Sequence, residues 1–303
     1  MSVWILGVSG VLAQADLTNA IANIRAEKFS DAQTELQGFL GAKQKNTDQI
    51  YYWLGYIAYQ QEAYDRAKTQ FEQSVGAKSK SPFGNAGLAV IALKEDKLAD
   101  AKEYFDNAVA FNKGKDIEAD FAIAEAYLEG GSSEIQQAKV ILYGTRDKAP
   151  DNPQSYILLG EYYKKQGVIE LAIEELEKAI SKAPDYVPAY VYLAELYYEQ
   201  GKETKNAEDF NKGFGYAQQA IKKNPEYAPA YRIRGELYLL LKEYQKARDD
   251  LKKYVSLAGN DRRARIRYAS FLFLAEDYEQ ALKELNSIDT TTNVMRRLKG
   301  IAY

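Results

Sequence analysis

The sequence predicts an all-α protein, a solenoid of about eight helix hairpins followed by a terminal half-repeat. A pattern of apolar and small residues recurs about every 34 residues from near Ala13 to the last residue, Tyr303. Within each repeat the apolar residues follow helical spacing, and glycine or proline marks the turns. Because a single hairpin cannot bury its own apolar face, such units stack on their neighbours.

The clearest repeat begins at Pro153, which we number position 1. Positions 4, 7, 8 and 11 are spaced i, i+3, i+4, i+7, which predicts a first helix, and positions 20, 24 and 27 predict a second one. Gly167 at position 15 favours the turn between them, because glycine adopts backbone conformations that other residues resist. Small residues at positions 8 and 20 let the two helices approach closely. Positions 4, 7, 8, 11, 17, 20, 24, 27 and 32 hold Tyr156, Leu159, Gly160, Tyr163, Ile169, Ala172, Leu176, Ala179 and Pro184.

The same template fits seven further stretches of the chain, two of which carry extra residues. About two are added within residues 129–137 and about seven within residues 202–213, where we expect either longer helices or a protruding loop. Residues 294–303 fit the first helix of a ninth unit, so we expect the natural protein to continue beyond Tyr303; a lone capping helix is the alternative. The eight units begin near Ala13, Asp48, Pro82, Ile117, Pro153, Val187, Ala228 and Arg262.

This pattern resembles the tetratricopeptide repeat family, which has Tyr or Trp, Leu-Gly, Tyr, Ala, Phe or Leu, Ala and Pro at those offsets. The resemblance implies a right-handed α-α superhelix whose first helices line a concave groove, with positions 2, 5, 9 and 12 facing it. The abundance of Tyr, Lys and Glu is similar to that of bacterial envelope proteins of this class.

The N-terminal segment calls for its own interpretation. Residues 3–12 are mostly apolar, and Ala13-Gln14-Ala15 matches a signal-peptidase site, but no Lys or Arg precedes Arg25. We expect residues 1–15 to be a signal-peptide remnant or an apolar strap, and residues 16–303 to be one continuous solenoid. A periplasmic or exported location is favoured, with a cytoplasmic one as the alternative.

Composition excludes several kinds of chemistry. The chain has no His and no Cys, which removes zinc fingers, thiol nucleophiles, His-based acid–base pairs and disulfides. A net charge of −3 does not favour nucleic-acid binding, and no phosphate-binding glycine motif or membrane-length apolar run occurs. We therefore expect no enzyme activity, no cofactor and no metal.

The positions that face the groove in this family hold aromatic and apolar residues at one end of the predicted groove. They are Tyr52, Tyr56, Tyr59, Phe83 and Val90. Tyrosine offers a large contact area with a polar tip, which suits the capture of a partner. The alternative is that these rings only complete the core.

Position 9 is Glu in four consecutive units, which stacking would place in a row: Glu125, Glu161, Glu195 and Glu236. The row predicts either a strip for ligands that carry Lys or Arg, or carboxylates that pair with local cations; the second interpretation is favoured. At the far end Arg232, Arg263 and Arg267 are expected to grip a carboxylate or phosphate. The family's clamp for chaperone tails needs Asn at two positions that hold Glu236 and Arg267 here, so that activity is not expected.

These observations favour a non-catalytic scaffold that binds an extended or helical segment of a partner protein in its concave groove. The alternative is a rigid arm of a larger bacterial envelope assembly or secretion component.

Overall fold

The computed structural model describes residues 14–41, 44–259 and 261–286. In these residues the chain forms sixteen α-helices, paired into eight hairpins that follow one another in order. Expected units and observed hairpins agree closely, since Pro82, Ile117, Pro153, Val187, Ala228 and Arg262 are each the first residue of a helix. The helices are α1 (Thr18–Arg25), α2 (Phe29–Leu40), α3 (Thr47–Gln60), α4 (Tyr64–Ala77), α5 (Pro82–Lys94), α6 (Leu98–Asn112), α7 (Ile117–Leu128), α8 (Ser132–Lys148), α9 (Pro153–Lys165), α10 (Ile169–Lys182), α11 (Val187–Thr204), α12 (Ala207–Lys223), α13 (Ala228–Leu240), α14 (Tyr244–Leu257), α15 (Arg262–Leu274) and α16 (Tyr278–Asn286).

Each hairpin is held by small residues facing large ones. A side chain at Gly160 would come within 2.9 Å of Leu176, and one at Gly235 within 2.8 Å of Leu251. In both pairs the glycine is on the first helix and the leucine on the second, so the small residue at position 8 sets the spacing of the hairpin, as expected. The extra residues in 202–213 lengthen α11 and α12, to 18 and 17 residues respectively.

The same hydrogen bond recurs at the junctions between successive hairpins. The position 4 hydroxyl of Tyr156 donates to the carbonyl oxygen of Pro150 at 2.7 Å, and Tyr190 and Tyr231 donate in the same way to Pro184 and Pro225. These bonds satisfy the proline carbonyl at the junction between one hairpin and the next.

The turns inside the hairpins depend less on glycine than expected. Gly167 has a φ of +72°, but Glu62 and Lys242 adopt the same left-handed conformation in their own hairpins, with φ of +59° and +58°. Their backbone N–H groups donate to carbonyls of the preceding helix, at 2.9 and 3.0 Å, and these bonds offset the strain.

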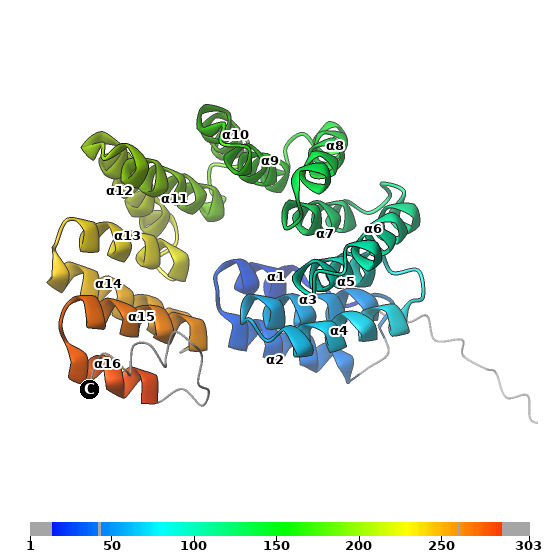
Figure 1. The fold of residues 1–303 in the computed structure, drawn as a ribbon, viewed down its shortest axis with the longest axis horizontal. Coiled ribbons are helices and arrows are strands. Elements are labelled where there is room, and N and C mark those ends of the chain that lie inside the picture. The colour runs from blue at the N-terminus through cyan, green and yellow to red at the C-terminus, as the bar shows by residue number, and fades with distance from the viewer. Residues whose placement is uncertain (1–13, 42–43, 260, 287–303) are drawn as a thin grey trace, which may run out of the picture.

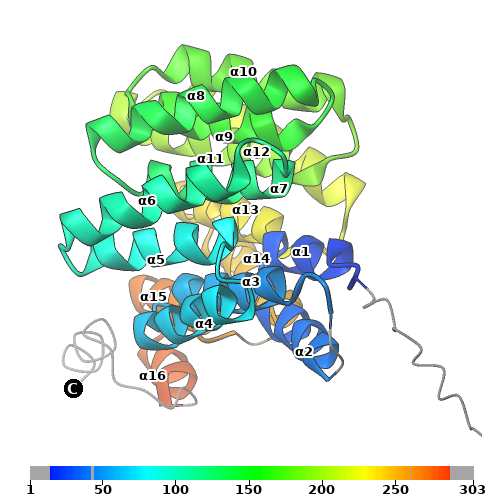
Figure 2. The ribbon, with the colours of Figure 1, turned by 90° about the vertical axis from the view of Figure 1, so that its right-hand side faces the viewer.

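The stack of hairpins curves round so that the first two hairpins lie near the last two (Figures 1 and 2). The Tyr227 hydroxyl donates to the carbonyl oxygen of Arg25 at 2.7 Å, and the Tyr254 hydroxyl donates to Glu27 at 2.6 Å. On the next hairpins, Gln61 donates to Asp261 at 2.8 Å. We call these the closure contacts, because they join residues at least 200 positions apart and turn the curved wall into a ring.

The two ends of the expected chain are only partly visible. Ala15 is buried, and its backbone N–H and C=O both bond the Asn46 side chain, at 3.0 and 2.9 Å. Residues 1–13 and 294–303, which carry the predicted leader or strap and the predicted half-repeat, lie outside the described residues. No helix among the described residues is both long enough and apolar enough to cross a membrane.

Candidate functional site

The inner wall of the ring surrounds a cavity of about 280 Å³, which we call the central cavity. Most of the residues that line it come from the first helices α1, α3, α5, α7, α9, α11 and α15, with Phe29 of α2 and Phe71 of α4 added, so the first helices face inwards. This is the arrangement that the family register implied. Ring closure changes the shape of the site, from an open groove to a partly enclosed chamber.

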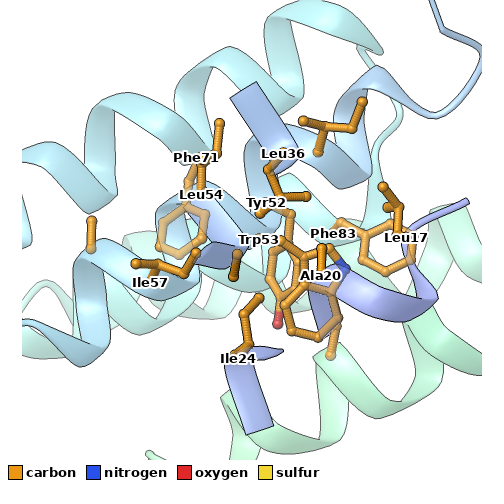
Figure 3. Close-up of a cluster of buried hydrophobic side chains, with 14 of the residues drawn as sticks. Leu17, Ala20, Ile24, Leu36, Tyr52, Trp53, Leu54, Ile57, Phe71 and Phe83 are labelled. Carbon is orange, nitrogen blue, oxygen red and sulfur yellow. The ribbon is translucent and has the colours of Figure 1, made fainter. Parts of the chain in front are cut away.

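Two of the predicted groove residues are core residues in the structure. Tyr52 and Phe83 are 3% and 1% exposed, and both rings pack in the cluster that contains Leu17, Ala20 and Ile24 beside and within α1 (Figure 3). Their ring centroids lie 5.5 Å apart. Tyr52 lines the central cavity and Phe83 does not, and neither side chain leaves much exposed surface for a ligand.

Three other predicted residues lie at the cavity itself. Tyr56 and Tyr59 are half-buried and line it, together with Val90, which is 8% exposed. The Tyr59 hydroxyl donates to Glu129 at 2.9 Å. Burial raises the pKa of the Tyr56 hydroxyl, so this group stays neutral and can donate a hydrogen bond at neutral pH.

The groove-facing positions of the family pattern did not include one aromatic residue of the site. Tyr192 lines the cavity with 38% of its surface exposed. It occupies position 6 of its repeat, which the family mapping does not count as groove-facing, and no feature of the sequence marks it as different from the other tyrosines.

The row of glutamates is divided into two pairs. Glu195 and Glu236 form ion pairs with Arg232, and Glu236 also pairs with Arg267. Arg232 contacts Glu27 at 3.5 Å as well, so this cluster joins the first hairpin to α11 and α13. Burial alone would raise the pKa of Glu27, but the charges of Arg232, Arg267 and Arg263 and the hydrogen bond from Tyr254 together outweigh it, so the pKa is lowered. For Glu195 and Glu236 the structure therefore agrees with the second interpretation of the row, in which the carboxylates pair with local cations.

Glu125 and Glu161 form the other pair and line the central cavity. Within the described residues neither has a cation within 4 Å; Glu125 accepts one hydrogen bond from Gln154 at 3.3 Å. Burial raises the pKa of the Glu125 carboxyl to about 7, although the charge of Arg25 opposes it, and burial also raises the pKa of Glu161. The site therefore holds two carboxylates that are poorly compensated by the protein.

The predicted arginines are placed differently from one another. Arg232 and Arg267 are engaged in the ion pairs above. Arg263 is exposed at the rim, lines the cavity, and donates to the backbone and side-chain oxygens of Gln60 at 3.2 and 3.1 Å. The three side chains do not form one anion-binding clamp, and the role predicted for them stays a prediction.

A second, more open depression of about 600 Å³ adjoins the central cavity, and Arg25 and Gln154 line both. We call it the side groove. Its walls come from the N-termini of α7, α9 and α11, and it offers an approach to the cavity from outside. The residues that line it are Arg25, Glu118, Asn152, Pro153, Gln154, Ala183, Pro184, Asp185 and Tyr186.

The described residues contain no group of three or more acidic side chains placed to hold a metal ion. The polar groups that line the cavity include phenols, carboxylates, amides and the guanidinium groups of Arg25 and Arg263. This set can bind a ligand by hydrogen bonds, charge and ring contacts.

Comparison with known proteins establishes the class. Residues 17–82, 157–213 and 215–262 match the Tetratricopeptide repeat family, which is more than half of the chain, so the protein belongs to that family. Repeats of this family generally mediate protein–protein interactions and are generally not catalytic. No curated protein matches the sequence.

Several solved structures share the fold at low sequence identity. One is the APC/C hetero-tetramer Cut9-Hcn1 (TM-score 0.53, 17% identity), where 94% of this chain aligns with 54% of that one. Another is a tetratricopeptide repeat protein from Parabacteroides merdae ATCC 43184 (TM-score 0.53, 14% identity; 84% and 97% of the two chains). A third is a monomeric IFIT1 mutant with Gppp-AAAA (TM-score 0.55, 16% identity; 93% and 70%). This chain thus spans about half the length of the first of them.

Proposed function

We propose that this protein is a non-catalytic scaffold that binds an extended segment of a partner protein at its inner wall. The observation that carries the proposal is the central cavity, where phenol rings and two poorly compensated carboxylates face one enclosed space. A folded repeat protein gains nothing in stability from leaving such groups unpartnered, which favours a role in binding.

The arrangement of the two hollows favours an extended segment. The central cavity of about 280 Å³ and the side groove of about 600 Å³ share Arg25 and Gln154. An extended chain lying in the side groove can pass single side chains inwards, past Arg25 and Gln154.

The other expectations about function depend on segments outside the described residues. A rigid arm of a larger envelope assembly and an exported or periplasmic location were inferred from residues 1–15 and from the end of the chain. The structural neighbours do not bear on either one. Both stay predictions.

Tyr56→Ala and Tyr192→Ala should each weaken partner binding by about 2 kcal/mol, roughly thirty-fold, because a truncated aromatic at the centre of an interface has an effect of that size. The ligands are twelve-residue peptides selected from a random library on the full chain, and their affinities are measured by fluorescence anisotropy. Tyr244→Ala is the matched control, since Tyr244 is 44% exposed and lies on α14, a second helix.

Circular dichroism should show unchanged helicity in all three variants. The proposal fails if the library yields no binder, or if the selected peptides bind Tyr56→Ala and Tyr244→Ala equally well.

A further inference from the structure

The central cavity combines ring faces with carboxylates in a way that defines the chemistry of its ligand. Tyr56 and Tyr192 line it from α3 and α11, and Glu125 and Glu161 line it from α7 and α9. The tyrosine rings are electron-rich on their faces, and such faces attract a cation that is also held by a carboxylate.

The protein's own cations leave these two carboxylates without an ion pair. The guanidinium of Arg25 lies 5.9 Å from the centre of the Tyr186 ring, at the boundary with the side groove. Lys164, on the helix that carries Glu161, pairs with Glu199 at 2.7 Å. Lys165 on the same helix acts on Glu161 by its charge but forms no ion pair with it within 4 Å. Arg263, at the rim of the cavity, donates to Gln60. By contrast, the neighbouring Glu129 has both Lys94, at 3.8 Å, and the Tyr59 hydroxyl.

Volume limits what can enter. A cavity of about 280 Å³ lies just below the usual range for small-molecule sites, which is roughly 300–1,000 Å³. It has room for one long side chain, and the side groove that shares Arg25 and Gln154 with it has room for the backbone that carries this side chain.

We propose that the central cavity receives a single cationic side chain, a lysine or an arginine, from the bound segment, between the Tyr56 and Tyr192 rings and the carboxylates of Glu125 and Glu161. This inference rests on the proposed function, since it specifies what the partner inserts. The ammonium or guanidinium replaces the missing counter-charge, while its aliphatic stem lies against the rings.

The proposal has a pH signature. The groups that act on Glu125 are Arg25, Glu118, Glu161 and the Gln154 amide, and burial raises the pKa of Glu125 to about 7. The chain has no His or Cys, so the side chain that titrates in this range is a buried carboxyl. A lysine ligand stays protonated throughout, with a pKa near 10.4. Because only the ionised carboxylate attracts it, binding should strengthen as the pH rises from 6 to 8.

The test measures the binding of small probes to the full chain by NMR titration. The probes are the capped amino acids Nα-acetyl-lysinamide and Nα-acetyl-argininamide, with Nα-acetyl-norleucinamide as the uncharged match of the lysine side chain. We expect a charged probe to bind at least about ten-fold more tightly than norleucine. The double variant Glu125→Gln, Glu161→Gln should lose this preference and the pH dependence, while Glu174→Gln, an exposed carboxylate on α10, should keep both.

Equal binding of norleucine and lysine, or an unchanged preference in the double variant, would overturn the inference. Peptides selected on the full chain separate this outcome from failure of the proposed function. If they bind through Tyr56 but carry no Lys or Arg at a fixed position, the scaffold role stands and the cationic site does not. If no peptide binds, the scaffold role itself is wrong.

Discussion

Replacement of Arg232 by Met should lower the free energy of unfolding by about 3–5 kcal/mol, because it removes the shared cation from three carboxylates in a half-buried cluster. The guanidinium lies 3.5 Å from Glu27 and 3.9 Å from Glu236, and it also pairs with Glu195. Its own side chain is only 12% exposed. Urea unfolding followed by circular dichroism measures the loss, and hydrogen exchange in α1 and α13 shows where it occurs.

The loss of stability in the Arg232→Met variant should depend on pH. In the wild-type protein the lowered pKa of Glu27 contributes stability above its unfolded value of about 4.5, and that contribution is lost as the pH falls through the folded value. Without Arg232 this contribution is smaller, so the difference in the free energy of unfolding between variant and wild type should be largest above about pH 4.5 and shrink as the pH falls below that value. Arg248→Met is the control, since its pair with Asp277 is more exposed than the Arg232 cluster and should contribute less than about 1 kcal/mol. Equal losses in both variants would show that the cluster does not hold the ring closed.

Phe71→Ala should also lower the free energy of unfolding by about 3–5 kcal/mol, because the Phe71 ring packs in the core between the second and third hairpins. Phe71 is 3% exposed and belongs to the cluster in Figure 3. Its ring lies against two glycines: a Cβ at Gly55 would come within 2.5 Å of the ring, and one at Gly87 within 2.2 Å. The measurement is again urea unfolding of the full chain.

A thermodynamic cycle makes this second prediction specific. Gly87→Ala alone should destabilise the protein by about 1–3 kcal/mol through overpacking. In the Phe71→Ala background the added methyl group enters empty space, so the same change should be neutral or stabilising. Additive effects would contradict the packing described here.

The fold could be predicted well from the sequence because its determinants are local. Pro153 and Pro82 each begin a first helix, since proline at the first helical position costs no hydrogen bond. Gly160 and Gly235 mark where a leucine of the second helix approaches. Each of these signals acts within one repeat of 34 residues and is seen again in the next.

Ring closure could not be predicted in this way. It depends on the small rotation added at each hairpin, summed over the whole stack, and a repeat pattern does not encode that angle. The closure contacts, such as Tyr227 with Arg25, join residues that have no periodic relation. For the same reason the sequence did not distinguish Glu195, which meets Arg232 across the closure cluster, from Glu161, which has no ion pair within the described residues.

The site residues followed from the register only in part. Position 9 of three repeats holds Tyr56, Glu125 and Glu161, and all three line the central cavity. Tyr52 occupies a groove position of the family pattern, but α1 packs against it, and the depth of that packing depends on Leu17 and Ile24. Whether the residues at the inner wall bind a partner stays a prediction until the variants are measured.

The central claim is that the chain closes into a ring around one cavity, and a designed crosslink tests it most directly. The sequence has no Cys, so Gln61→Cys with Asp261→Cys introduces the only two thiols. Since these side chains are in contact at 2.8 Å, a short bismaleimide should join them within one molecule in high yield. The pair Gln61→Cys and Lys178→Cys, with one residue beside the closure and the other on α10, should remain unlinked within a molecule. Efficient crosslinking of 61 to 261 and not to 178 is the predicted result; failure to link 61 to 261 in a folded protein would contradict the closed ring.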